Sequence, residues 1–265
     1  MLNYGDANIE IIKVTEYRTP LGEIVIGRVR NGGYVQIAGP QLLSEIKAVS
    51  NIMLELGAGF VIIDGALDRI TSAAPTISES TILSTGAVVS RDINKVIDET
   101  AHLVSLFNLP AIENKETRLT VEELIQNNKI AIINQDNKAD IIPLKTALKS
   151  GNIIGDYLKD DSKYIVIPGS LVKNTVEDLT RSTRKYKDVE IIVTDGTKIF
   201  INPNDWIRFQ RQGIIVKVLD KVDLVALTLN PYSPKGYYFE PLNFLEQMKS
   251  RINKVPVMDL ILGGE

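Results

Sequence analysis

Gly59-Phe-Val-Ile-Ile-Asp-Gly-Ala-Leu-Asp-Arg69 is the stretch of the chain from which its fold is predicted. Four consecutive apolar residues, 60–63, end at Asp64, and Asp68 and Arg69 follow closely. A short unbroken apolar run beside glycine is typical of a strand buried on both faces of a parallel sheet. Because ligands bind beyond the carboxyl ends of such strands in open α/β sheets, these three polar residues are the leading site candidates.

Asp64 has two interpretations. In nucleotide-hydrolysing folds, an apolar strand that ends in aspartate often supplies the carboxylate that holds Mg²⁺, so Asp64 is the candidate metal ligand. An Asp-Gly turn that closes a strand explains the same residue without any ligand. A Walker A phosphate loop ends in Gly-Lys-Ser or Gly-Lys-Thr, and the chain contains no Gly-Lys dipeptide. The expected metal carboxylate therefore lacks its usual phosphate loop.

The composition excludes several kinds of chemistry. The chain has 265 residues, a formal net charge of −3, no cysteine and one histidine, His102. Thiolate metal sites, cysteine nucleophiles and disulfides are excluded because there is no cysteine. A Ser-His-Asp triad is nearly excluded because there is only one histidine. Nucleic-acid binding is not expected without a basic excess. No apolar run approaches the roughly 20 residues that span a bilayer, and no export signal is evident, so a cytoplasmic protein is expected.

The first part of the chain predicts β structure followed by a helix. Strands are expected over 9–14, 23–29 and 34–37, with a turn at 20–22 and a hairpin at Asn31-Gly32. Apolar residues at helical spacing then predict a helix over 41–56, directly before the central apolar run.

Next come a predicted strand at 82–90 and a helix that Ser90 caps. His102 falls inside this helix and is expected to be a surface or half-buried side chain. The charged stretch 111–119 is the candidate boundary between domains 1–112 and 120–265, although one continuous domain is the alternative.

The remaining chain alternates strands and helices. Thr120 is expected to begin a helix through a capping box, and Ser170 to cap another or contact an anion. The other predicted elements are a hairpin at 129–133 and 139–142, strands at 164–167, 189–193, 214–218 and 224–229, and helices at 170–184, 204–212 and 240–248. The predicted class is α/β: a mostly parallel sheet flanked by helices, with an N-terminal antiparallel β-hairpin section.

Asn230 opens a proline-rich loop, Asn230-Pro-Tyr-Ser-Pro-Lys-Gly236, directly after a predicted strand. A rigid turn explains the loop without a ligand. Its position after the strand also makes Asn230 a candidate ligand-binding residue.

Several segments together resemble a known bacterial family that is found with amino-acid fermentation enzymes. They are Val61-Ile-Ile-Asp-Gly-Ala-Leu-Asp-Arg69, Ile82-Leu-Ser-Thr-Gly-Ala87, Thr19-Pro-Leu-Gly22, Gly33-Tyr-Val-Gln-Ile-Ala-Gly-Pro40 and Asn230-Pro-Tyr-Ser-Pro234. The family is the reactivase subunit associated with the adenosylcobalamin-dependent lysine 5,6-aminomutase. The segment at 61–90 is fairly specific, whereas the other segments are short.

The resemblance implies an accessory protein with a P-loop NTPase-like fold. Such reactivases use nucleotide to expel damaged cobalamin from the mutase, beside a second ATPase subunit. Because the family's phosphate loop is missing here, ATP and Mg²⁺ are expected only if that loop is supplied elsewhere. By resemblance Asp64 is the strand-end carboxylate, Asp68 and Arg69 line the same pocket, and Ser78, Glu79 and Thr85 are neighbours.

Three functions remain open at this point. The first is the accessory role, with incomplete nucleotide chemistry. The second is a metal-assisted hydrolase or transferase that uses Asp64 and Asp68 on a small charged substrate. The third is a purely structural or homo-oligomer-forming protein, in which Asp64 and Asp68 cap turns and bind nothing.

Overall fold

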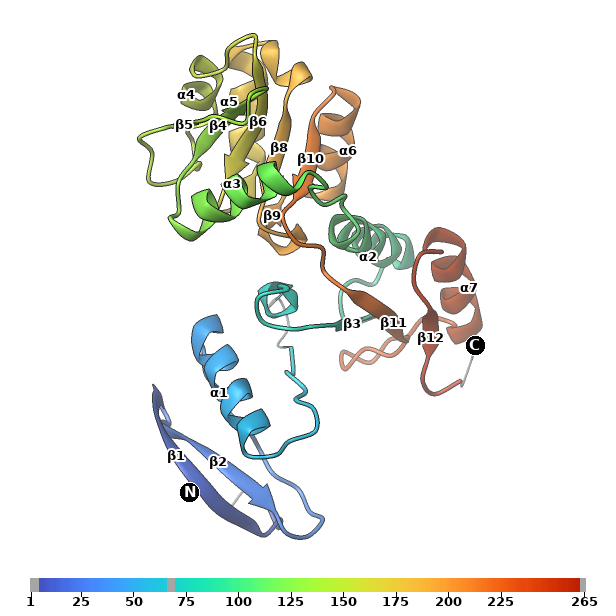
Figure 1. Ribbon diagram of the computed structural model, residues 1–265. Helices are drawn as coiled ribbons and strands as arrows, with labels where there is room; N and C mark the ends of the chain where they lie inside the picture. The colour runs from blue at the N-terminus through green and yellow to red at the C-terminus, as the bar shows by residue number, and fades with distance from the viewer. Residues whose placement is uncertain (1–4, 66–69, 263–265) are drawn as a thin grey trace. The chain divides into compact units, whose positions relative to one another are not determined.

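The computed structural model describes residues 5–65 and 70–262. The protein is a mixed α/β protein with a parallel sheet, a mixed sheet, flanking helices and an N-terminal antiparallel hairpin, which confirms the predicted class (Figure 1). The chain forms two compact units, Met1–Ser72 and Ala73–Glu265. This division lies earlier in the chain than the boundary expected at 111–119. Residues 115–119 form the first part of helix α3 (Lys115–Gln126) instead.

The N-terminal hairpin pairs β1 (Ile9–Thr19) with β2 (Gly22–Val29). The two strands are joined at Pro20 and Leu21, because proline presets the backbone of a turn and Gly22 adopts a positive φ of 127°. The turn at 20–22 is therefore confirmed. The hairpin predicted at Asn31-Gly32 is wrong, since these residues follow β2 and 34–37 form no strand.

Helix α1 (Leu43–Glu55) confirms the helix predicted over 41–56. The central buried strand is wrong: residues 60–65 carry no strand, and the side chains of Phe60 and Ile62 are 75% and 80% exposed. A strand requires a neighbour to hydrogen-bond with. In the described part of this unit the only sheet is the β1–β2 pair, so the apolar run has no adjoining strand.

The second unit contains a five-stranded sheet of order β10-β8-β6-β4-β5. The antiparallel pair β4 (Ala131–Asn134) and β5 (Ala139–Ile141) confirms the predicted second hairpin. The parallel strands are β6 (Ser162–Ile167), β8 (Glu190–Val193) and β10 (Ile215–Val218), which confirm three further predicted strands.

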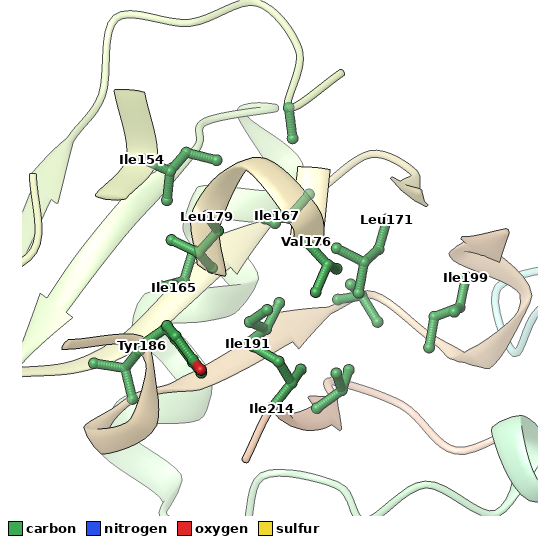
Figure 2. Close-up of a cluster of buried hydrophobic side chains, with 14 of the residues drawn as sticks. Ile154, Ile165, Ile167, Leu171, Val176, Leu179, Tyr186, Ile191, Ile199 and Ile214 are labelled. Atoms are coloured by element: carbon green, nitrogen blue, oxygen red, sulfur yellow. The ribbon is translucent and has the colours of Figure 1, made fainter. Parts of the chain in front are cut away.

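Helices cover both faces of this sheet. Along β6, Ile165 faces a core with α4 (Gly151–Asp156), α5 (Lys173–Ser182) and α6 (Pro203–Arg211), part of which Figure 2 shows. Val166 faces a second core with Val121 and Leu124 of α3. Because successive side chains of a strand point to opposite faces, an unbroken apolar strand is buried here on both sides, as parallel strands are.

A three-stranded parallel sheet has the order β12-β11-β3. Its strands are β3 (Thr81–Gly86), β11 (Leu224–Asn230) and β12 (Val257–Asp259). One face packs against α2 (Ile93–Phe107) and α7 (Pro241–Arg251) through a core that includes Val96, Leu227, Phe244 and Met248 (Figure 1).

Three predicted helix starts are wrong in detail. Asp92 caps α2, and its carboxylate accepts from the backbone N–H of Asn94 at 2.9 Å, so Ser90 is not the cap. Asn114 caps α3, and Thr120 lies inside that helix. Ser170 precedes the short strand β7 (Leu171–Val172), so it does not cap α5. A serine, threonine, asparagine or aspartate acts as an N-cap only where it directly precedes the first residue of a helix.

Short elements complete the structure. They are strand β9 (Ile199–Phe200), which pairs with β7, and the 3₁₀ turns η1 (Ile70–Ala73), η2 (Lys185–Asp188) and η3 (Gly196–Lys198). None of the helices in the described ranges is long and apolar enough to cross a membrane.

Candidate functional site

Asp64 lies in the segment 60–65, which forms no helix or strand, and its side chain is exposed to solvent. Asp68 and Arg69, its predicted partners, fall outside the described residues. A Cβ added at Gly57 or Gly59 would meet no atom within 4 Å, so close packing does not require glycine at either position.

The described residues give no support to a nucleotide or Mg²⁺ site around Asp64, and the predicted partners Asp68 and Arg69 fall outside them. The described residues contain no group of three or more carboxylate or imidazole side chains that could hold a metal ion. We therefore derive no nucleotide chemistry from the residues around Asp64.

Thr85 and Asn230 come together at the carboxyl edge of the three-stranded sheet. In the parallel ladder Thr85 pairs with Leu229, and Gly86 pairs with Asn230. The Thr85 hydroxyl lies 2.9 Å from the Thr100 hydroxyl of α2, and the Asn230 side-chain oxygen accepts from the backbone N–H of Tyr232 at 3.0 Å. These contacts orient α2 and the loop after β11, which is how the two residues act within the fold.

Ser78 and Glu79 precede β3, at the end of that strand opposite to Thr85. The backbone N–H of Ser78 donates to the carbonyl of Ala74 at 3.0 Å, and β3 begins only at Thr81. At about 3.3 Å per residue, the part of β3 from Thr81 to Thr85 spans roughly 13 Å, and Glu79 lies before it. The structure therefore does not bring Ser78 and Glu79 to the edge that holds Thr85.

The predicted site residues also belong to different units. Asp64 is part of Met1–Ser72, whereas Ser78, Glu79, Thr85 and Asn230 are part of Ala73–Glu265. Their assignment to one ligand site stays a prediction.

The sequence reasoning missed a buried polar group after β8. Asp195 is only 1% exposed, and its carboxylate accepts from the backbone N–H of Thr197 at 2.8 Å and from the Thr197 hydroxyl at 2.5 Å. Thr194 donates to the carbonyl of Pro168 at 3.2 Å. The polar run 194–197 directly after an apolar strand was the available signal.

This buried group supports the packing of α2. A Cβ at Gly196 would collide with the carbonyl oxygen of Leu106, so only glycine allows the turn to approach the helix. Asp195 caps the 3₁₀ turn η3 that Gly196 begins. The cluster therefore has a structural explanation and needs no ligand.

His102 lies on α2 and is half-buried against the segment that leads to α6, as predicted. Its Nε2 lies 2.8 Å from the carbonyl oxygen of Ile201, and its ring meets the Trp206 ring edge-on at 6.1 Å between centroids. Burial lowers the pKa of His102, and the contact with the Ile201 carbonyl opposes that shift. The ring is therefore a neutral packing group whose Nε2–H donates to Ile201.

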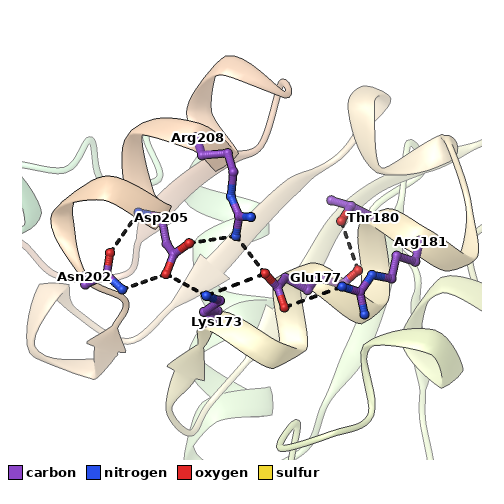
Figure 3. A network of polar contacts seen from close by, with 7 residues as sticks. All are labelled: Lys173, Glu177, Thr180, Arg181, Asn202, Asp205 and Arg208. Carbon is purple, nitrogen blue, oxygen red and sulfur yellow. Dashed lines mark hydrogen bonds and ion pairs between the residues drawn. The ribbon is translucent and has the colours of Figure 1, made fainter.

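A charged network joins α5 to α6 (Figure 3). Lys173 lies 3.0 Å from a carboxylate oxygen of Asp205, and Arg208 lies 2.7 Å from both Asp205 and Glu177. The hydrogen bond from Lys173 lowers the pKa of Asp205, and burial acts in the opposite direction. Arg181 pairs with Glu177 at 3.9 Å. The positive groups in this network are paired with carboxylates, which leaves them poorly suited to bind an anion.

The hollow beside this network is shallow. Its volume is about 410 Å³, and it is lined by Asn204, Ile207, Arg208, Arg211 and Gln212. These residues all belong to α6 or its C-cap, so the hollow is the surface of a single helix. Ligand sites usually draw residues from several elements, so it has no feature of a built pocket.

The fold and these sites define an α/β protein whose polar clusters mainly hold elements together. The chain matches no family model, no curated protein and no solved structure. Functional arguments therefore depend on the residues themselves.

Proposed function

We propose that the protein is a protein-binding accessory subunit, of reactivase type, that acts on a cobalamin-dependent amino-acid aminomutase in the cytoplasm. The observation that carries the binding role is the exposure of the apolar segment, which we define as residues 60–63. Phe60 and Ile62 are 75% and 80% exposed in a stretch with no strand partner. The resemblance of 61–69 to the reactivase family supplies the class of partner.

An apolar segment that has no strand partner suits binding as an added strand. Its backbone can pair with a strand of another protein, while alternate side chains enter pockets on the partner. Phe60 and Ile62 are two residues apart and so point to the same side of an extended chain. We propose that this side contacts the mutase.

In this proposal a partner protein supplies the phosphate loop of the nucleotide site. Since the described residues form no phosphate cradle, we propose that ATP and Mg²⁺ are bound with a phosphate loop supplied by the second ATPase subunit. Asp64 follows the apolar segment directly, so a partner bound there would lie next to its carboxylate.

Binding of a purified, inactivated lysine 5,6-aminomutase to the full chain tests the accessory role. The double substitution Phe60→Asp with Ile62→Asp is expected to raise the dissociation constant at least about tenfold, because charges replace buried apolar contacts. Leu119→Asp, at a 67% exposed apolar residue of α3, is the matched control and should leave binding unchanged. Absence of binding by the unaltered chain, with or without the ATPase subunit, would refute the proposal.

A thermal-shift screen separates this role from metal-assisted hydrolysis. ATP, ADP, GTP, Mg²⁺ and cobalamins are each added to the chain alone, since a ligand that binds only the folded state raises the midpoint. The accessory role predicts no shift with Mg²⁺ alone. A shift with Mg²⁺ that Asp64→Ala abolishes would instead favour the hydrolase or transferase that uses Asp64 and Asp68.

A further inference from the structure

Asn31 and Gly32 form the only Asn-Gly dipeptide in the chain. They follow β2, which ends at Val29, and belong to no helix or strand. Both residues are exposed to solvent. No hydrogen bond within the described ranges holds the backbone N–H of Gly32. The backbone at this dipeptide is therefore free of the ladder that keeps the preceding strand in place.

The surroundings of Gly32 leave room for its backbone nitrogen to approach the Asn31 side chain. A Cβ added at Gly32 would meet no atom within 4 Å beyond its chain neighbours, and glycine has no side chain to hinder the approach. The side-chain oxygen of Asn31 accepts from the backbone N–H of Asn8 at 2.8 Å. This donor lies where it stabilises negative charge that develops on that oxygen.

We propose that Asn31 is a site of spontaneous deamidation. The backbone nitrogen of Gly32 loses its proton and attacks the side-chain carbonyl carbon of Asn31. A carbon–nitrogen bond forms, and the side-chain nitrogen leaves as ammonia. Water then opens the cyclic succinimide at either carbonyl carbon, which yields aspartate or isoaspartate. Water is the only co-reactant, and nothing is oxidised or reduced.

Isoaspartate at position 31 would disturb close contacts that follow it in the chain. The backbone N–H of Tyr34 donates to the Asp6 carboxylate at 2.6 Å, and the carbonyl of Tyr34 accepts from the N–H of Ala7 at 3.4 Å. A Cβ added at Gly33 would lie 2.6 Å from the backbone nitrogen of Ala7, so the two stretches of chain approach closely. Isoaspartate inserts a methylene into the backbone directly before these contacts. They cannot then all be kept in register.

Aspartate at the same position should have a smaller effect. It keeps the normal backbone, and its carboxylate can still accept from the Asn8 N–H. The only change is one added negative charge. The substitution Asn31→Asp therefore separates the effect of the charge from the effect of the inserted methylene.

Peptide mapping by mass spectrometry of the full chain, stored in mildly alkaline buffer, tests this proposal. Loss of the Asn31 amide is expected to accumulate with time and to speed up as pH rises, because the attacking nitrogen must lose its proton. Gly32→Ala is expected to slow the loss at least about tenfold, because the added Cβ hinders the attack. Gly32 has open space and no positive φ, so this variant should fold normally.

Asn253 is the matched control within the same sample. It is exposed in an irregular segment as Asn31 is, but Lys254 follows it, so its amide should persist. An Asn31 amide that lasts as long as that of Asn253 overturns the proposal. Equal rates of loss in the unaltered chain and Gly32→Ala also overturn it.

Hydrogen exchange measures the structural consequence. In the isoaspartate form, separated by ion exchange, the backbone N–H groups of Ala7 and Tyr34 should exchange faster than in the unaltered chain. Asn31→Asp should keep their protection. Equal protection in the isoaspartate form and the unaltered chain would refute the predicted loss of register.

Discussion

At the scale of single residues, His102 shows how burial decides the role of a side chain. It is the only histidine in the chain, and its ring packs beside Trp206 while its Nε2 contacts the carbonyl of Ile201. Burial disfavours the charged ring and lowers its pKa below the ordinary 6.5. The folded protein therefore prefers neutral His102, whereas the unfolded chain takes up the proton more readily.

This difference predicts a loss of stability on acidification. The contribution of neutral His102 is complete above about pH 6.5 and is lost as the pH falls through the lower pKa of the folded state. Urea unfolding between about pH 7.5 and 5.5 should show a decreasing free energy of unfolding for the unaltered chain. His102→Gln should show a smaller decrease over this range, because no other side chain ordinarily titrates there. Equal decreases in both proteins would contradict the assignment.

At the scale of elements, the start of α2 separates two candidate caps that stand close together in the sequence. The Asp92 carboxylate accepts from the backbone N–H of Asn94, the second residue of α2. The Ser90 hydroxyl accepts only from the backbone N–H of Asp92, at 3.1 Å, before the helix begins. An N-cap satisfies backbone donors of the first turn that otherwise lack a partner. Asp92 meets this need, and Ser90 shapes the preceding turn.

The two residues should therefore differ in their effect on stability. Asp92→Ala is expected to lower the free energy of unfolding by about 1 kcal/mol, the usual cost of losing an N-cap. Ser90→Ala should cost less than about 0.5 kcal/mol, as surface substitutions usually do. Denaturant unfolding of both variants at neutral pH measures the difference, and a larger loss for Ser90→Ala would show that the cap is misassigned.

At the scale of the whole molecule, the buried apolar residues are distributed unequally between the two units. In the described ranges, the three buried hydrophobic clusters all belong to Ala73–Glu265. The unit Met1–Ser72 contributes only Ile24 and Ile26 to the described buried hydrophobic residues. Because burial of apolar surface is the main favourable term in folding, the two units should differ strongly in stability.

Separate expression of the units tests this difference. A fragment of residues 73–265 is expected to keep its far-ultraviolet circular dichroism and to unfold cooperatively. A fragment of residues 1–72 should unfold at a much lower temperature or lack a cooperative transition, because an isolated two-stranded hairpin is marginal in water. A stable 1–72 fragment at low concentration, or an unfolded 73–265 fragment, would contradict this account.

The sequence predicted best the elements whose signals are local and whose neighbours follow in order. The apolar strands at 164–167 and 189–193 were found because helices on both sides bury them, and Pro203 and Pro241 mark the first turns of α6 and α7. The same reasoning failed for 60–63, which is also an unbroken apolar run. Apolar character shows that a segment can be buried and says nothing about which strand will pair with it.

The candidate site divides in the same way. The resemblance suggested Thr85, and the sequence indicated that Asn230 follows a strand; the parallel register of β3 and β11 then brought the two residues to one edge. Sequence reasoning gave no sign that Asp195 is buried beside α2. Composition, turns and helical periodicity are properties of neighbouring residues and can be read from the chain. Which strands pair, and which polar groups they enclose, depends on contacts between distant residues, and only the tertiary structure decided those.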